Sequence, residues 1–548
     1  MADSIYGLIS NAYGKNHFEV DYPFRALLEY FGYDGGQLSE LGGFVGGVAY
    51  EVADYVDKVA RPRLVYWSIG GERVDKAWLD PALRLVLNEL VKRFRVNERP
   101  YTVGDWFHYF SAIYLIGDPG VSCILTVTNQ TAYAIHKYGD SGAKRFLPGL
   151  IGEGEPLFGA TWFTEVQGGS DLGANLVEAY LDGGVWRLRG IKYFSSNAGL
   201  AGVALVTARP RGARSGVKGV SLFLVPEFDS RGKRNFNVLR LKEKSGTLSV
   251  PTGEVEFDGS EAILLGDADK GIYYTMEDLM VSRLSNAVGA LGIARKAYLE
   301  AYYYSQRREA FGRRLLDHPL VQRDLVEMEV FIEGAMSVAF RAIDAFQKSW
   351  RQTPPYGEEY HYARLLTHIA KNLTAEAAAH VTRLAMELHG GIGFLSEFPV
   401  ERWHREALIT PIWEGPSNIQ ALDMLEAIAK KGAHIVLLRE LEERMGDFGG
   451  CDAEHSALYK EMHSRINGVF REMASLGERE AQFAAKDVLM EIGHSLAVAT
   501  LAHASCKLGS RRLLSVAETY KERFVDKRAI TPRGPEEMMD IISVDKSF

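Results

Sequence analysis

Residues 411–420 read PIWEGPSNIQ, the most informative stretch of this sequence. It places Glu414 between a tryptophan and a glycine, immediately before a helix that the pattern predicts to begin at Ser417. Apolar neighbours disfavour the charged form of a carboxyl group and raise its pKa toward the range that suits a catalytic base. The alternative, at least as good on this stretch alone, is that Glu414 is an anion that complements the N-terminus of that helix.

On both sides of this stretch, the patterns of apolar residues divide the chain into four regions. A long helix ends at Gly390-Gly391, because apolar residues recur every three or four positions up to that point, at Leu366, Ile369, Leu373, Ala377, Val381, Leu384 and Leu388. In contrast, Trp186 and Leu188 alternate with arginines, and Leu222 and Leu224 alternate around Phe223. We therefore expect a helical domain over 1–157, a compact antiparallel β-domain over 158–262, a helical bundle over 263–430 and a helical extension over 431–548.

Three further motifs suit a phosphorylated, ring-containing ligand, although each also has a plain structural interpretation. Residues 161–171, TWFTEVQGGSD, end a strand in a turn whose glycines let main-chain N–H groups approach a phosphate, or they form an ordinary loop. Residues 192–197, KYFSSN, place an aromatic ring beside two hydroxyls, which suits stacking on a flat ring, but strand aromatics are usually core. Residues 307–314, RREAFGRR, offer arginine forks for phosphate, or a solvated helix end.

Composition narrows the class of protein. The chain has 548 residues, 47% of them apolar and 24% charged, and a net charge of −8, so its surface as a whole does not suit a polyanion. Cys123, Cys451 and Cys506 are too few and too scattered for a disulfide framework, which fits a reducing compartment. The first twenty residues lack the basic start and the unbroken apolar run of a signal peptide, so none is expected, and no run of eighteen apolar residues occurs. These features predict a soluble, cytoplasmic protein without a membrane partner.

Several common sites are excluded by spacing. There is no HExxH motif, and His361 and His368 lie seven positions apart, off one helix face, so no metal site is predicted. The run of glycines at 42–47 lacks the GxGxxG spacing of a dinucleotide-binding turn. No GxSxG nucleophile motif occurs.

Taken together and in this order, the four motifs resemble the acyl-CoA dehydrogenase superfamily over residues 110–430. Residues 62–64 and 70–75, the TEVQGGSD loop, the IWEGPSNI segment and the long C-terminal extension are similar to the adaptive-response AidB-like branch. The resemblance implies an α+β fold with an N-terminal helical domain, a central antiparallel β-barrel domain, and a C-terminal helical bundle followed by a helical extension. It also implies FAD as the cofactor and a homodimer or homotetramer.

The resemblance assigns roles to individual residues. Glu414 matches the catalytic carboxylate, Arg283 matches an arginine near the active site, and Arg283 and Ser170 would contact substrate. Phe194 would lie against the isoalloxazine ring, with Ser195 and Ser196 bonding its edge. The remaining FAD contacts would come from Thr164, Gly169, Ser170 and Asn418 and, at the adenine end of a neighbouring subunit's FAD, from Arg308, Phe311, Gln322, Glu387, Gly390 and Gly391.

Two departures bear on turnover. Pro416 stands where the family often has threonine, which removes a hydroxyl and an N–H, and Glu387 stands where a glutamine is common. FAD binding remains expected, but efficient turnover of ordinary acyl-CoA does not follow.

The resemblance implies that Glu414 takes the α-proton of an acyl-CoA thioester while the β-hydride passes to flavin N5, with an electron-transfer protein as an eventual acceptor. An alternative is an AidB-like flavoprotein that binds double-stranded DNA through its extension, where a basic run comprises Lys507, Arg511, Arg512, Lys521, Arg523, Lys527, Arg528 and Arg533. Acids and bases nearly balance from residue 430 onward, so a helical oligomerisation surface is the preferred interpretation of that region. A scaffold that has lost catalysis is a third interpretation, against which Glu414 argues.

Overall fold

The computed structural model describes residues 5–530 and 535–544. The chain forms two compact units that do not follow the order of the sequence. The β-unit comprises Glu51–Tyr109 and Asp118–Ser282, and the helical unit comprises Met1–Tyr50, Phe110–Gly117 and Arg283–Phe548. Three helices contribute residues to both units: α3 (Val48–Val59), α6 (Trp106–Ile116) and α10 (Gly271–Arg307).

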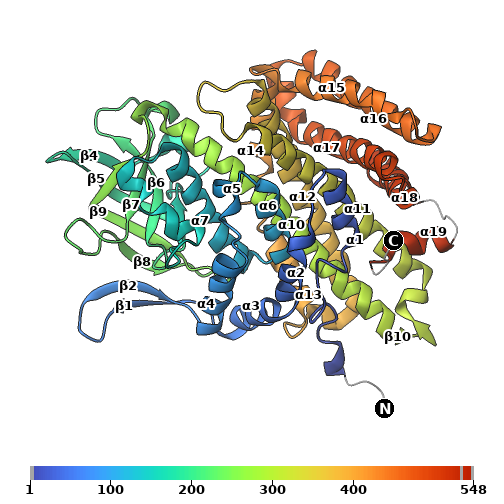
Figure 1. Ribbon diagram of the computed structural model, residues 1–548, viewed down its shortest axis with the longest axis horizontal. Helices are drawn as coiled ribbons and strands as arrows, with labels where there is room; N and C mark the ends of the chain where they lie inside the picture. The colour runs from blue at the N-terminus through green and yellow to red at the C-terminus, as the bar shows by residue number, and fades with distance from the viewer. Residues whose placement is uncertain (1–4, 531–534, 545–548) are drawn as a thin grey trace. The chain divides into compact units, whose positions relative to one another are not determined.

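A seven-stranded sheet forms the centre of the β-unit (Figure 1). Its strands are β3 (Gly159–Trp162), β4 (Glu178–Asp182), β5 (Val185–Ser196), β6 (Val203–Pro210), β7 (Ser221–Pro226), β8 (Asn237–Leu241) and β9 (Thr252–Leu264). The pairing runs from β6 through β4, β5, β9 and β7 and returns to β6, which closes the sheet into a barrel. Strand β3 adds to β6 and strand β8 adds to β9.

The expected barrel is confirmed, but it is not purely antiparallel. Strand β6 runs parallel to both β3 and β4, whereas the other pairings of the sheet are antiparallel. Parallel neighbours require a crossover connection. Here the connection between β3 and β6 contains β4 and β5. Residue alternation shows which face of a strand is buried, but it does not show the direction in which two strands pair.

Strands β6 and β7 are buried on both faces. Phe223 and Val225 point into the barrel core, while Leu222 and Leu224 pack with Ile135 in a second apolar cluster on the other face. The alternation seen around Phe223 therefore separates two buried faces and not a buried face from an exposed one. The helices of this unit are α4 (Pro81–Asn88), α5 (Arg99–Thr102), α7 (Pro119–Tyr138), α8 (Ser141–Lys144) and α9 (Leu147–Ile151).

A β-hairpin interrupts the N-terminal region, which the sequence pattern predicted as mostly helical. Strands β1 (Arg63–Trp67) and β2 (Arg73–Trp78) pair antiparallel (Figure 1). Buried Asp75 anchors the hairpin, because its carboxylate accepts a hydrogen bond from the N–H of Val238 on β8 at 2.8 Å.

The helical unit consists of long helices and a two-residue-strand hairpin. Its elements are α1 (Tyr22–Tyr30), α2 (Ser39–Gly46), β10 (Glu309–Ala310), β11 (Arg313–Arg314), α11 (Pro319–Ser349), α12 (Glu358–His389), α13 (Pro399–Ala407), α14 (Ser417–Ala429), α15 (Ala433–Arg444), α16 (Ala453–Ala474), α17 (Glu478–Leu508), α18 (Arg511–Tyr520) and α19 (Pro535–Ile542). Helix α12 ends at His389 and α14 begins at Ser417, as the sequence predicted.

The C-terminal extension packs directly on the bundle. Helix α17 lies against α11, α12 and α14, and α18 lies against α11. Gly334 on α11 permits this approach, because a Cβ atom at that position would come within 2.1 Å of the Tyr520 ring on α18. The extension is therefore part of the same compact unit as the bundle.

Cys451 and Cys506 form a disulfide within this unit, and Cys123 is a free, buried thiol. The three cysteines are too few and too scattered to predict a disulfide framework, but one disulfide forms, because the turn before α16 returns to the end of α17 and brings two positions 55 residues apart to a Cα–Cα distance of 5.6 Å. Within the described residues, no helix combines the length and the apolar character needed to cross a bilayer.

Candidate active site

Glu414 lies in a strained turn between α13 and α14. Its backbone has φ +58°, and that of Gly415 has φ +90°, so two consecutive residues occupy the left-handed region. The φ of Gly415 favours glycine, because a side chain there would be strained, and a Cβ atom would also meet the Gln420 side-chain nitrogen at 2.9 Å. Non-glycine residues in this region are uncommon and persist where surrounding contacts hold them.

Side chains from three helices hold this turn through its carbonyl oxygens. The Glu414 carbonyl accepts hydrogen bonds from Arg283 Nε at 3.0 Å and Gln420 Nε2 at 3.1 Å. The Gly415 carbonyl accepts from Lys371 Nζ at 2.9 Å and from Gln420 Nε2 at 2.7 Å. The half-buried Trp413 donates its indole N–H to Asn286. The main chain on either side of Glu414 is thus fixed, which orients its half-buried side chain.

A second layer of polar groups supports these donors. Arg283 forms an ion pair with Asp423 at 3.0 Å, and Gln420 Oε1 lies 2.8 Å from His368 Nδ1. Burial lowers the pKa of His368 to about 3, so this imidazole is neutral at physiological pH. Burial, reinforced by the positive charge of Arg283, lowers the pKa of Lys371 to about 7.

Sequence reasoning found Glu414 and Arg283 but missed Lys371, His368 and Gln420. The available signal was the presence of His368 and Lys371 between the regularly spaced apolar residues of the helix that ends at His389. Both side chains are fully buried. Buried ionisable side chains away from the surface are rare and mark sites where a specific interaction is made.

Of the residues expected at the adenine end of FAD, Glu387, Gly390 and Gly391 lie at the C-terminal end of α12, whereas Arg308 and Phe311 lie at the β10–β11 hairpin and Gln322 in the first turn of α11. Gly390 and Gly391 follow the last turn of that helix, 19 residues beyond Lys371, which corresponds to about 28 Å along a helix axis. Phe311, at the tip of the β10–β11 hairpin, is 96% exposed, and Arg308 is exposed and makes no ion pair within the described chain.

Three other residues of the helical unit that were predicted to contact FAD are less well placed to bind a ligand. Glu387 is exposed and forms an ion pair with Arg383 one helical turn away, at 2.7 Å. Gln322 is half-buried, and its amide nitrogen lies 4.0 Å from the sulfur of Met539. Asn418 is exposed in the first turn of α14.

In the β-unit, the loop after β3 is fastened by a buried ion pair. Lys192 Nζ lies 2.7 Å from the Glu165 carboxylate, and both side chains are at most 4% exposed. The same carboxylate accepts hydrogen bonds from the N–H groups of Leu176 at 2.7 Å and Val177 at 3.1 Å. Burial lowers the pKa of Lys192 to about 8, although Glu165 favours its charged form. Gly169 and Ser170 of this loop are exposed.

Strand β5 presents the predicted ring-binding residues. Phe194 is 56% exposed and Ser196 is half-buried, whereas Ser195 is fully buried, as alternation along a strand requires. The Ser195 hydroxyl has no hydrogen-bond partner in the described chain. The N–H of Tyr193 donates to the Thr164 carbonyl at 2.9 Å and so joins this strand to the loop.

These observations fit a flat ring attached to phosphates. An exposed aromatic side chain, a neighbouring half-buried hydroxyl and an exposed loop of glycine and serine come together on one unit. Phe194 and Ser196 lie on the more exposed side of β5. Ser195 lies on its buried side, so a ligand could contact the Ser195 side chain only from within the protein.

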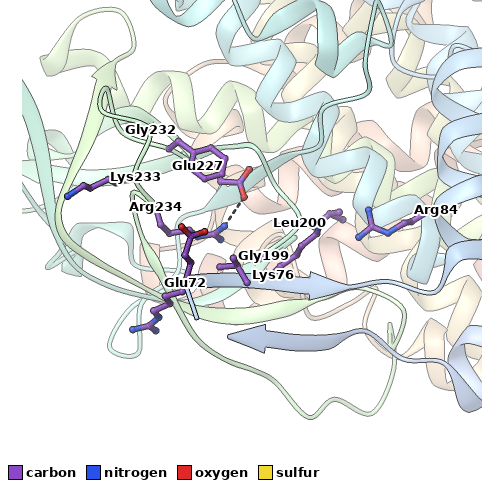
Figure 2. Close-up of a pocket in the computed structure, with 12 residues that line it drawn as sticks. Glu72, Lys76, Arg84, Gly199, Leu200, Glu227, Gly232, Lys233 and Arg234 are labelled. Atoms are coloured by element: carbon purple, nitrogen blue, oxygen red, sulfur yellow. Dashed lines mark hydrogen bonds and ion pairs between the residues drawn. The ribbon is translucent and has the colours of Figure 1, made fainter. Parts of the chain in front are cut away.

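A separate cavity of about 660 Å³ lies elsewhere in the β-unit, and none of the predicted site residues lines it (Figure 2). Glu72, Arg73 and Val74 of the hairpin form part of its wall. Arg234 and Glu227 form an ion pair across it at 2.7 Å (Figure 2).

Comparison with known proteins identifies the family of the chain. Residues 160–260 match the family model of the acyl-CoA dehydrogenase middle domain, and residues 269–429 match that of the acyl-CoA dehydrogenase C-terminal domain. The chain belongs to the acyl-CoA dehydrogenase superfamily. The chain is therefore an oxidoreductase of the acyl-CoA dehydrogenase class, with FAD as its cofactor.

The relatives support an AidB-like branch. Acyl-CoA dehydrogenase family member 11 of Caenorhabditis elegans is 30% identical over 417 residues, which cover 71% of this chain and 66% of that protein. The putative acyl-CoA dehydrogenase AidB of Escherichia coli K12 is 29% identical over 430 residues, covering 75% and 77%. The crystal structure of Caenorhabditis elegans ACDH-11 in complex with C11-CoA has a TM-score of 0.81 at 25% identity, covering 94% of this chain and 91% of that chain.

Proposed function

We propose that this acyl-CoA dehydrogenase removes hydrogen from the α and β carbons of an acyl-CoA thioester, with Glu414 as the base that takes the α-proton. The observation that carries the proposal is the turn at 414–415, where four hydrogen bonds to two carbonyl oxygens fix the backbone that bears Glu414. A base must be held within reach of the proton it removes, and such fixation supplies that orientation.

The substrate class is supported by the ACDH-11 structure, which contains C11-CoA. When bound, FAD supplies the acceptor for the β-hydride. Within this chain, we assign Phe194 and Ser196 to the isoalloxazine ring and Gly169 and Ser170 to the pyrophosphate side. Arg283 acts on Glu414 by bonding its carbonyl and is itself held by Asp423.

The test is an anaerobic titration of the purified yellow protein with a panel of acyl-CoA esters. Glu414→Gln should retain the visible flavin spectrum but should not bleach with any ester that bleaches the parent. Glu443→Gln, which changes an exposed carboxylate on α15, serves as the matched control and should bleach normally. Bleaching of Glu414→Gln at the parent rate would refute the assignment of the base.

We also propose assembly into a homodimer or homotetramer, because Gly390 and Gly391 lie about 28 Å along α12 from Lys371, which bonds the Glu414 turn, and most of the adenine-end residues are exposed. Light scattering of the FAD-loaded protein tests this assembly. A monomer that keeps full FAD affinity would contradict it.

Binding of double-stranded DNA through the extension is the alternative, and the observed ion pairs disfavour it. Five cations of the basic run are already paired with carboxylates: Lys507 with Asp447, Arg511 with Glu454, Arg512 with Glu333, Lys521 with Glu461, and Arg523 with Glu327. Arg533 lies outside the described residues. A salt titration decides, because binding to phosphates weakens steeply as salt rises. Duplex affinity that falls in this way would favour the alternative.

A further inference from the structure

We propose that Lys371 is a positioning residue for Glu414, because its ammonium group holds the Gly415 carbonyl and thereby fixes the turn that presents the carboxylate. The inference rests on the proposed role of Glu414 as the base. Lys371 lies in the middle of α12, is fully buried, and donates from Nζ to the Gly415 carbonyl oxygen at 2.9 Å.

Burial of a lysine side chain for a single hydrogen bond is unfavourable in free energy. Desolvation of an ammonium group costs several kcal/mol unless a counter-ion compensates for it. Lys371 has no carboxylate within 4.0 Å in the part of the chain that the structure describes, in contrast to Lys192, which is paired with Glu165. An apolar side chain would fill the same space without that cost, so helix packing alone does not account for a lysine here.

The charges around Lys371 connect it to the base. Arg283 on α10 disfavours its charged form, while Glu414 in the turn and Glu376 one turn further along α12 favour it. On α14, Asp423 is engaged with Arg283, and the neighbouring His368 on α12 is neutral at physiological pH. The protonation of Lys371 therefore depends on the charge of Glu414, and the reverse holds by linkage.

The turn needs this donor because its backbone is strained. Residues 414 and 415 both have positive φ, and such a conformation persists only where surrounding contacts hold it. Gln420 divides its single amide nitrogen between the two carbonyls, and Arg283 bonds only that of Glu414. Lys371 is therefore the only cationic donor to Gly415 in the described chain.

Protonation of Lys371 should then govern the efficiency of proton abstraction near neutrality. Burial and Arg283 lower the pKa of Lys371 to about 7. Below this pH the charged ammonium makes a strong hydrogen bond and favours ionised Glu414, and above it both effects weaken. The rate of flavin reduction by a bleaching ester should therefore show an inflection near pH 7.

The experiment uses the FAD-loaded parent, Lys371→Met, Lys371→Gln and the control Lys430→Met, which changes an exposed lysine at the end of α14. Lys371→Met should keep FAD and bind the ester with little change in Kd, while its reduction rate falls about 10- to 100-fold, as expected when a reacting group is misplaced. Lys371→Gln retains an N–H donor, so it should keep more of the rate but lose the inflection near pH 7. Lys430→Met should match the parent in both respects.

A crystal structure of Lys371→Met adds a readout that does not depend on activity, and it should show the 413–416 turn displaced. Parent-like rates and pH profiles in both variants would overturn the proposal. If Lys371→Met does not fold, Lys371→Gln still decides, because a parent-like rate and pH profile in that variant would overturn the proposal. The two failures give different results. If only the role of Lys371 is wrong, Lys371→Met reduces normally but Glu414→Gln does not bleach. If the base assignment is wrong, Glu414→Gln bleaches as well.

Discussion

Arg512 on α18 and Glu333 on α11 form a bidentate ion pair, with nitrogen–oxygen distances of 2.9 and 2.6 Å. Arg512 also donates to the main-chain carbonyls of Asp540 and Ile541 at 2.8 Å each. Its guanidinium group thus joins α11, α18 and α19 in one buried contact. Arg512 is the most deeply buried of the described cations of the basic run, and it is committed to structure and not available to a phosphate backbone.

Replacement of Arg512 should be strongly destabilising. Arg512→Met leaves the Glu333 carboxylate buried without its counter-ion, and loss of one member of a buried pair costs about 3–5 kcal/mol. Urea unfolding monitored by circular dichroism would measure this loss. Arg511→Met is the matched control, because it breaks an exposed pair with Glu454 and should cost less than about 1 kcal/mol. Equal losses in the two variants would mean that burial of the Arg512 pair has no energetic weight.

Local features of the site were predictable from sequence, but its long-range contacts were not. The start of α14 at Ser417 and the end of α12 at His389 follow from residues a few positions away. The donors to the turn do not, because Arg283 is 131 residues from Glu414 and Lys371 is 44 residues from Gly415. Periodicity identifies a buried helix face but does not show which polar group on it meets which loop.

The same limit applies to three features that differ from the sequence-based predictions: the pairing of β4 with β6, the β1–β2 hairpin and the disulfide. Strand alternation identified the β-domain, but the direction of pairing between β4 and β6 depends on how the chain crosses over. The hairpin of β1 and β2 lay within a region dominated by helical patterns, and its anchor, Asp75, finds its partner Val238 163 residues away. The disulfide joins positions that only folding brings together.

The thiol content offers a simple test of that disulfide. The denatured protein without reductant should react with one equivalent of a thiol reagent, at Cys123, and with three equivalents after reduction. Because the bridge closes a 55-residue segment, Cys451→Ser with Cys506→Ser should lower the free energy of unfolding by about 2–4 kcal/mol under oxidising conditions. Three reactive thiols without reductant would show that the pair does not form in the isolated protein.

A buried carboxylate should make stability depend on pH near neutrality. Burial raises the pKa of Glu329 to about 7, despite its ion pair with Arg295. Because this folded-state pKa lies above the ordinary value of 4.5, the stabilisation is complete below pH 4.5 and is lost as pH rises through 7.

Relative to Glu329→Gln, the parent should therefore lose up to about 3 kcal/mol of unfolding free energy between pH 4.5 and 8. Comparison with the variant cancels the buried histidines, such as His368, whose lowered pKa values act with the opposite sign. Glu327, with a pKa lowered to about 2, changes only at more acidic pH. Parallel stability curves for the parent and Glu329→Gln would exclude this role for Glu329.

The pair of Lys192 and Glu165 should control how firmly FAD is retained. Lys192 Nζ also donates to the Phe163 carbonyl at 3.0 Å and to the Asn175 side chain at 2.7 Å, so it joins β5 to both ends of the loop that carries Gly169 and Ser170. Lys192→Met leaves Glu165 buried without its cation, and the loop can relieve that cost only by moving Glu165 toward water. We therefore expect FAD to dissociate at least about tenfold more readily, since a misplaced loop loses its pre-organised phosphate contacts.

Flavin fluorescence released on dilution measures this affinity, and Lys233→Met, at an exposed position of the same unit, is the control. A second variant separates loop geometry from barrel stability. Thr207→Val removes a hydroxyl 3.1 Å from Lys192 Nζ but leaves the ion pair intact. It should lower the unfolding free energy without a matching loss of FAD affinity. If Thr207→Val and Lys192→Met weaken FAD binding in proportion to their loss of stability, the ion pair acts on the barrel as a whole and has no specific hold on the loop.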